Sequence, residues 1–247
     1  MIQAHSFKSP EERGENTMRQ REKSPSLAMK KPDPSPEPSK RSNSAIPFCK
    51  RCFQDIQVRR WGDLILEEPL LCSRCAEEFK PRLRKSKFAG HTLYWLYEYN
   101  EAFRSTLYTL KGCGDYELKD VFLSRQAPLL KLRFRGYEIV PAPSYHERDE
   151  VRGFNHVEAI FASLGLPIRP YLRKTADKKQ ADSSKEERKQ IGKFIAITEG
   201  AKIKGKKILF VDDVLTTGST LKACVSLLAS KGAKRVETLV LARVRPV

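Results

Sequence analysis

The residues best suited to chemistry are a run of acids and hydroxyls at 207–220, with the sequence KILFVDDVLTTGST. An apolar stretch typical of a buried strand ends in Asp212 and Asp213, and a helix is expected to begin at the TTGST turn. Open α/β sheets bind ligands at the carboxyl ends of their strands, and a helix N-terminus presents unpaired N–H groups to an anion. This order of residues therefore predicts a phosphate site beside two carboxylates.

Each residue type in this run has a physical role in binding a phosphorylated sugar. Gly218 lacks a Cβ, so the backbone can approach a phosphate closely, and the neighbouring hydroxyls add hydrogen-bond donors. The two carboxylates can accept hydrogen bonds from the vicinal hydroxyls of a ribose, and can also act through bound Mg²⁺. The predicted phosphoribosyl-binding residues are Asp212, Asp213, Thr216, Thr217, Gly218, Ser219 and Thr220.

The same run resembles the signature of type I phosphoribosyltransferases, in which an apolar strand, two acids and a Thr-rich turn follow one another. The resemblance implies phosphoribosyl pyrophosphate as the ligand, with Mg²⁺. A chance strand, turn and helix without a ligand is the alternative, and the agreement of acids, hydroxyls and context disfavours it.

Four of the six cysteines form two Cys-x-x-Cys pairs, Cys49–Cys52 and Cys72–Cys75, with 19 residues between them. Two such pairs can present four thiolates to one tetrahedral Zn²⁺, and four protein ligands close the site, so this zinc would be structural. Free thiols or a redox pair are the alternative. Cys113 and Cys224 are expected to be a turn residue and a core residue.

A second candidate segment, at 140–155, has the sequence VPAPSYHERDEVRGFN and follows another expected strand. Its arginines can neutralise a pyrophosphate or DNA phosphates, and its serine and asparagine can add hydrogen bonds. A solvated charged loop is the alternative for the arginines, and Lys111 could simply stabilise a helix end. The predicted pyrophosphate or DNA-phosphate residues are Ser144, Arg148, Arg152, Asn155 and Lys111.

These motifs together resemble the ComF/GntX family over residues 49 to about 243. The resemblance implies a phosphoribosyltransferase-like fold behind a zinc module, and a role in natural transformation, handling single-stranded DNA in the cytoplasm with a ComFA-type helicase as partner. The family's usual asparagine after Arg188 is missing, and no hood that would select an acceptor base is readable. The matching residues are Lys111, Gly114, Asp115, Arg148, Arg152, Gly153, Phe154 and Asn155, and more weakly Gln180 and Arg188.

The alternation of apolar patterns predicts the fold class: α/β, type I phosphoribosyltransferase-like, a Rossmann-like parallel sheet with a small N-terminal zinc ribbon. Strands are expected at 91–100, 137–143, 207–213 and 236–244, and helices at 101–111, 116–133, 154–164 and 219–231. The expected organisation is a disordered tail at 1–46, a zinc-ribbon module at 47–79, a basic linker at 80–90 and the phosphoribosyltransferase-like domain at 91–247.

The chain is strongly basic, with a net charge of +17 and a pI near 9.7, which favours a polyanionic partner. Cations interleaved with aromatic residues suit a single strand, because the charges follow the backbone and the rings stack on bases. An ordinary solvated linker is the alternative. The predicted nucleic-acid contacts are Arg59, Arg60, Trp61, Lys80, Arg82, Arg84, Lys85 and Lys87.

Two functions follow from these resemblances. The first is a competence-type protein for natural transformation, with a domain that binds phosphoribosyl pyrophosphate; a weaker variant makes the zinc module the DNA-binding part. The second is an active phosphoribosyltransferase that transfers ribose 5-phosphate to a base or amine. No apolar run approaches the ~20 residues that span a bilayer, and no signal-peptide core is present, so we expect a cytoplasmic protein.

Overall fold

The computed structural model of the chain describes residues 47–56, 70–79, 81–144, 146–175 and 194–244, without the side chains of His146 and Arg148. Residues 45–247 form one compact unit. The predicted tail at 1–46 lies outside the described residues, as do the predicted site residues Arg59, Arg60, Trp61, Lys80, Gln180 and Arg188.

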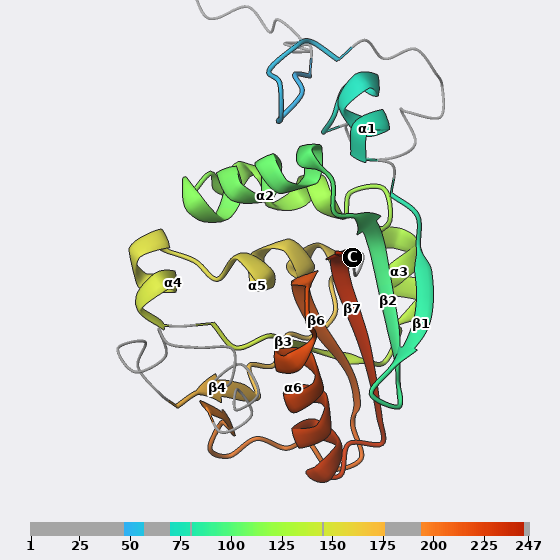
Figure 1. Cartoon of the computed structure of the whole chain (residues 1–247), viewed down its shortest axis with the longest axis vertical. Coiled ribbons are helices and arrows are strands. Elements are labelled where there is room, and N and C mark those ends of the chain that lie inside the picture. The colour runs from blue at the N-terminus through green and yellow to red at the C-terminus, as the bar shows by residue number, and fades with distance from the viewer. Residues whose placement is uncertain (1–46, 57–69, 80, 145, 176–193, 245–247) are drawn as a thin grey trace, which may run out of the picture. The chain divides into compact units, whose positions relative to one another are not determined.

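A five-stranded sheet forms the centre of this unit, in the order β1-β2-β7-β6-β3 (Figure 1). The neighbours β2, β7, β6 and β3 are parallel, whereas the edge strand β1 is antiparallel to β2. The predicted α/β fold with a mostly parallel sheet is therefore confirmed. The strands are β1 (Arg84–Phe88), β2 (His91–Glu98), β3 (Glu138–Pro141), β6 (Lys207–Leu215) and β7 (Arg235–Arg243).

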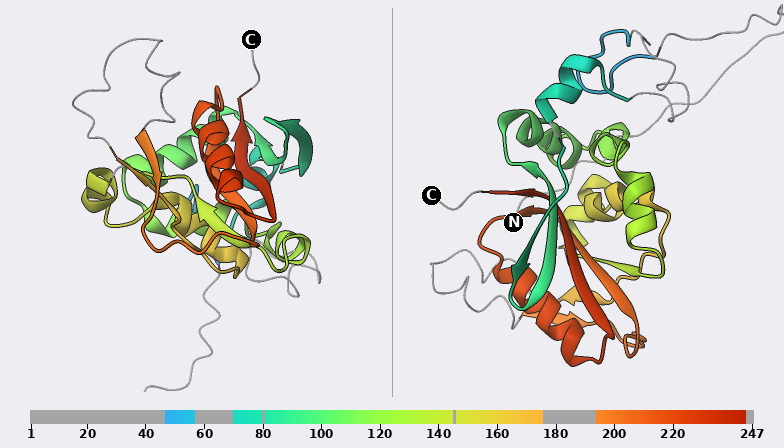
Figure 2. Two further views of the ribbon diagram at one scale, coloured as in Figure 1. Left: turned by 90° about the horizontal axis from the view of Figure 1, so that it is seen from below. Right: turned by 90° about the vertical axis from the view of Figure 1, so that its right-hand side faces the viewer.

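Helices cover both faces of the sheet, because its central strands are apolar on both sides. In β6, Leu209 and Val211 belong to one core cluster with α2, α3 and α5, whereas Ile208 and Phe210 belong to another with α6. Figure 2 shows α6 across the sheet from α3 and α5. The helices are α1 (Ser73–Phe79), α2 (Glu101–Gly112), α3 (Ala127–Arg133), α4 (His146–Arg152), α5 (His156–Phe161) and α6 (Ser219–Ser230).

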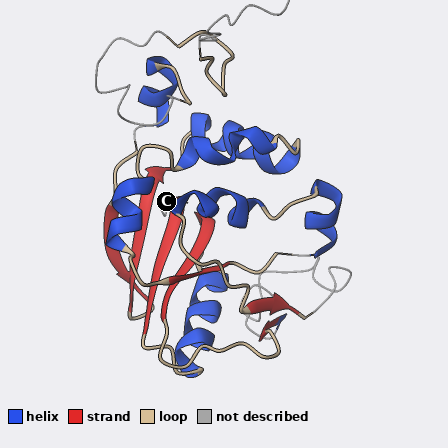
Figure 3. Cartoon of the chain, turned by 180° about the vertical axis from the view of Figure 1, so that it is seen from behind, coloured by secondary structure: helices blue, strands red, loops and turns tan. Residues whose placement is uncertain are grey.

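Two short strands, β4 (Leu172–Lys174) and β5 (Ile195–Ile197), form a separate antiparallel pair, which Figure 3 shows apart from the main sheet. The helix expected at 154–164 is present as α5 followed by the 3₁₀ turn η3 (Ala162–Leu164). Within the described part of the chain, no helix is long and apolar enough to cross a membrane.

The single helix predicted at 116–133 is wrong, because the segment is broken in two. A 3₁₀ helix, η2 (Tyr116–Phe122), comes first, and α3 begins only at Ala127. Pro128 lies in the first turn of α3. A proline fits there, since its missing N–H would have no partner, but it cannot continue a helix from the preceding turn.

The segment predicted as a basic linker at 80–90 contains β1. Its side chains alternate between half-buried and exposed, as expected when one face of a strand packs on a core. Ala89 and Gly90 have φ of +49° and +82°, the left-handed pair typical of a two-residue hairpin turn into β2. Exposed Lys85 and Lys87 on this edge strand disfavour pairing with another sheet.

Candidate phosphate and ribose site

The predicted strand, turn and helix at 207–220 are confirmed. β6 ends at Leu215 and α6 begins at Ser219, with Gly218 as its N-cap in the left-handed conformation. Thr216 and Thr217 in the turn between them are exposed. The hydroxyl-rich turn therefore lies open at the carboxyl edge of the sheet, in front of a helix N-terminus that favours an anion.

Gly218 is required for a reason that the sequence did not reveal. Its φ is +75°, and a Cβ at this position would lie 2.3 Å from Cζ of Phe88 and 2.9 Å from its Cε2. We expected the missing Cβ to make room for a phosphate. The structure instead places the ring of Phe88, from β1, against the glycine. A residue of the segment predicted as a linker therefore packs against the predicted phosphate loop.

Asp213 is held by protein groups on both of its oxygens. Its Oδ2 accepts from Nζ of Lys111 at 3.0 Å and contacts Nε2 of His156 at 3.1 Å, and its Oδ1 accepts from the N–H of Val214 at 2.6 Å. Burial alone would raise the pKa of Asp213, but the hydrogen bond from His156 and the charge of Lys111 outweigh it and lower this pKa well below its ordinary value. Asp213 is therefore an anion with a fixed orientation.

Asp212 differs from its neighbour, although the two acids are adjacent in sequence. Burial, followed by the charge of Asp213, raises the pKa of Asp212 to about 8. Its Oδ1 accepts from the N–H of Asp213 at 2.9 Å. One carboxylate and one neutral carboxylic acid therefore lie at the end of β6, so the pair offers acceptors and one acidic proton to a sugar diol.

His156 is the site residue that the sequence reading missed. It begins α5, and its ring lies between Nη1 of Arg152, 3.1 Å from Nδ1, and the carboxylate of Asp213. Arg152 also donates from Nε to the backbone oxygen of Lys111 at 2.8 Å and from Nη1 to Asp149 at 3.2 Å. The predicted residue Lys111 thus contacts Asp213 directly, and the predicted residue Arg152 is linked to Asp213 through His156. Its position directly after the Arg152–Asn155 motif was the available signal.

Ser144 and Asn155, predicted as phosphate contacts, bond to one another and to Asp149. Nδ2 of Asn155 donates to the hydroxyl of Ser144 and to Asp149 at 3.0 Å each, and Ser144 donates to the same carboxylate. Oδ1 of Asn155 caps α5 by accepting from the N–H of Glu158. A cavity of about 480 Å³ adjoins this group, between the end of β3 and β4. Their contact with a phosphate stays a prediction, as does that of Arg148.

The four paired cysteines form one cluster, with all their sulfur atoms within 4.8 Å of one another. Burial and the neighbouring thiols raise the pKa of Cys75, whereas N–H groups of Cys72, Cys52 and Arg51 outweigh burial and lower the pKa of Cys49 to about 7. Sulfurs packed this closely need a cation to be stable as thiolates. The cluster therefore fits structural zinc, which Cys49, Cys52, Cys72 and Cys75 would hold.

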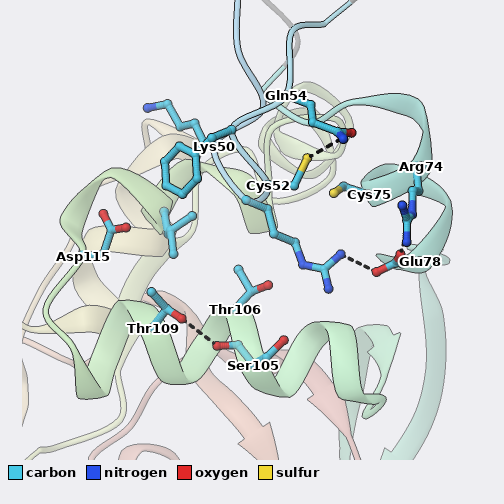
Figure 4. A pocket seen from close by; sticks show the side chains of 13 residues that line it. Lys50, Cys52, Gln54, Arg74, Cys75, Glu78, Ser105, Thr106, Thr109 and Asp115 are labelled. Atoms are coloured by element: carbon cyan, nitrogen blue, oxygen red, sulfur yellow. Dashed lines mark hydrogen bonds and ion pairs between the residues drawn. The ribbon is translucent and has the colours of Figure 1, made fainter.

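A cavity of about 400 Å³ lies between this cluster and α2 (Figure 4). Arg51 and Arg74 both pair with Glu78, and Lys50 pairs with Glu117 at 2.8 Å. The opposite wall carries hydroxyls of α2 that already donate to their own helix, such as Thr109 to the Ser105 carbonyl at 3.1 Å. Each of these three cations thus has an acidic partner in the protein, and two of them share Glu78.

The described members of the predicted nucleic-acid surface lie on and before β1. Arg84 pairs with Glu98 across the hairpin, and Lys87 donates to Thr92 at 3.3 Å. Arg82, Lys85 and Lys87 are exposed. These cations lie on or directly before β1, and Phe88 at the end of β1 contacts Gly218 of the phosphate loop.

Comparison with known proteins identifies the domain family to which the residues of this site belong. Residues 151–245, which include His156, Asp213 and the whole phosphate loop, match the phosphoribosyl transferase domain family. A hypoxanthine phosphoribosyltransferase from Staphylococcus aureus superposes with a TM-score of 0.35 at 18% identity, over 52% of this chain and 64% of that one. The domain match and the observed sheet define a phosphoribosyltransferase-type fold.

Two proteins of similar sequence show which family the whole chain belongs to. Competence protein ComFC of Streptococcus pneumoniae is 33% identical over 222 residues, which are 79% of this chain and 99% of that protein. Competence protein ComFC of Bacillus subtilis is 30% identical over 164 residues, 66% of this chain and 67% of that protein. The chain belongs to the ComFC family of competence proteins.

Proposed function

We propose that the loop from Asp212 to Thr220 binds the phosphoribosyl group of phosphoribosyl pyrophosphate. The observation that carries the proposal is the meeting of an open hydroxyl-rich turn, a helix N-terminus and the anchored carboxylate of Asp213 at one edge of the sheet. The backbone N–H groups and hydroxyls of residues 216–220 would hold the 5-phosphate. The acids of β6 would hold the ribose hydroxyls.

Mg²⁺ in this proposal accompanies the pyrophosphate of the ligand. Mg²⁺ keeps several waters and commonly binds through one or two carboxylates plus substrate phosphates. Here one acid is neutral and the other is already bonded to protein donors, so these two residues do not form a cage for the ion by themselves.

Isothermal titration calorimetry tests the binding proposal. Asp212→Asn combined with Asp213→Asn keeps the size of both side chains but removes the anion and the acidic proton. We expect the unaltered chain to bind phosphoribosyl pyrophosphate with Mg²⁺ and the double variant to lose detectable binding. Asp55→Asn, at an exposed aspartate of the cysteine module, serves as the control. Unchanged affinity in the double variant would contradict the ribose assignment.

For the cellular role, we propose that the protein acts in natural transformation and handles incoming single-stranded DNA in the cytoplasm, together with a ComFA-type helicase. Membership of the ComFC family supports this proposal, and so do the net charge of +17 and the exposed cations of β1. In a transformable strain that lacks the gene, DNA uptake with a normal yield of recombinants would refute it.

The DNA contact itself can be tested on β1. Replacing Lys85 and Lys87 by alanine should weaken binding of a fluorescent oligo-dT and reduce the slope of log affinity against log salt by about 1.4, which is ~0.7 for each lost phosphate contact. Lys202→Ala with Lys234→Ala removes the same charge from exposed positions elsewhere and is the matched control. Equal slopes in the two variants would refute a specific role for β1.

An active phosphoribosyltransferase is the second candidate, favoured by the domain match over residues 151–245. Asp213 and the phosphate loop would bind the donor, and a base or amine would attack C1 of the ribose as pyrophosphate leaves. Release of pyrophosphate by the purified protein, measured across bases and amines, tests this activity. If the protein binds phosphoribosyl pyrophosphate but turns over none of these acceptors, the proposed catalytic activity is refuted and only the binding function remains.

A further inference from the structure

The carboxylate of Asp213 has little capacity left for a ligand. A carboxylate offers about four acceptor positions. Lys111, His156 and the N–H of Val214 occupy three of these, so a ribose that presents two hydroxyls to this group needs one protein donor to leave. The N–H of Val214 is part of the β6 backbone, so the choice lies between Lys111 and His156.

These two side chains differ in how firmly they are held. The side chain of Lys111 is 41% exposed, and its ammonium lies on a flexible stem that can turn toward solvent or a phosphate. The side chain of His156 is 13% exposed, and its second nitrogen is fixed by Arg152. Lys111 is therefore the donor that can leave, and His156 is the one that stays.

The contact with Arg152 also determines where His156 carries its proton. A guanidinium has only N–H donors, so Nδ1 of His156 must accept from it and cannot carry a proton. The proton of a neutral ring then lies on Nε2, which donates to Asp213. Arg152 is itself fixed by hydrogen bonds to the backbone oxygen of Lys111 and to Asp149, so its contact with Nδ1 fixes the orientation of the His156 ring.

We propose that His156 is the positioning residue of the ribose site. It carries a proton on Nε2 alone and holds the Asp213 carboxylate in a fixed orientation, while the side chain of Lys111 moves away so that the ligand hydroxyls can bind. The inference rests on the proposed binding of a phosphoribosyl group at this site. In this arrangement Lys111 becomes available to the pyrophosphate of the same ligand, which agrees with its predicted role as a phosphate contact.

Two substitutions at one position test the inference. His156→Gln can reproduce both contacts, since its amide N–H₂ can donate to Asp213 and its oxygen can accept from Arg152, whereas His156→Leu keeps the bulk and loses both. By calorimetry with phosphoribosyl pyrophosphate and Mg²⁺, we expect the glutamine variant to stay within about threefold of the unaltered chain and the leucine variant to bind at least tenfold more weakly. His91→Gln, on β2, is the matched control.

A second measurement does not depend on the ligand or on a variant that folds. Nitrogen-15 NMR of the ligand-free chain distinguishes a protonated from an unprotonated ring nitrogen, and should show His156 with a proton on Nε2 only. A proton on Nδ1, or equal affinities of the glutamine and leucine variants, would overturn the inference. If the unaltered chain does not bind phosphoribosyl pyrophosphate, the proposed function falls, and the NMR result still decides the inference about the ring.

Discussion

Replacing Gly218 by alanine should destabilise the fold through two effects that can be separated. Alanine in the left-handed region costs roughly 1–2 kcal/mol, and Gly218 has φ of +75°. The new Cβ would also lie 2.3 Å from Cζ of Phe88, closer than any real contact, so the ring must shift. Overpacking of this kind costs about 1–3 kcal/mol. The sum is a loss of roughly 2–5 kcal/mol in the free energy of unfolding.

Urea unfolding of a double-mutant cycle separates the two effects. In a Phe88→Ala background the clash is gone, so Gly218→Ala should cost only the backbone strain of about 1–2 kcal/mol. Gly200→Ala is the matched control, because Gly200 has φ of +74° and nothing within 4 Å of its Cβ position. An equal cost of Gly218→Ala with and without Phe88 would refute the contact between the hairpin and the loop.

Three further outcomes are expected. Removing zinc with a chelator, or Cys72→Ser, should release one equivalent of metal and lower the melting temperature, and a chain that contains no zinc as purified would contradict the structural site. Burial raises the pKa of Asp212 to about 8 from its ordinary 3.8. The contribution of the protonated Asp212 to the free energy of unfolding is therefore full below pH 3.8 and is lost as pH rises through 8. In urea unfolding, Asp212→Asn should reduce the fall of the free energy of unfolding over this pH range, and an unchanged pH dependence would argue against a neutral Asp212. Asn155→Ala removes the cap of α5 and should cost about 1–2 kcal/mol, as Asn100→Ala should for α2. A negligible loss of stability would contradict a stabilising role of this cap.

Local patterns were sufficient to predict the phosphate loop and the cysteine cluster. In 207–220 the apolar strand, the acids and the turn glycine are adjacent in sequence, so the chain order already fixes their positions at the edge of the sheet. The spacing of the cysteine pairs likewise predicted a cluster that the fold brings together.

The partners of these residues could not be predicted, because they come from distant parts of the chain. Phe88 lies at the end of the edge strand β1 and Gly218 lies directly before α6, so only the folded chain brings them together. A single sequence carries no signal for that contact. His156 follows the Arg152–Asn155 motif directly, but its role depends on Asp213, which lies 3.1 Å away in the fold and far away in the sequence. The break before α3 could be predicted from Pro128, because a proline cannot continue a helix from the preceding turn.

A crystal structure of the chain with phosphoribosyl pyrophosphate and Mg²⁺ would show whether the loop from Asp212 to Thr220 binds the phosphoribosyl group. We expect the 5-phosphate on the N–H groups of residues 217–220 and the ribose hydroxyls on Asp213, with His156 in place and Lys111 turned away from that carboxylate. A ligand bound elsewhere, or bound with the contact between Lys111 and Asp213 intact and no contact to the loop, would contradict it.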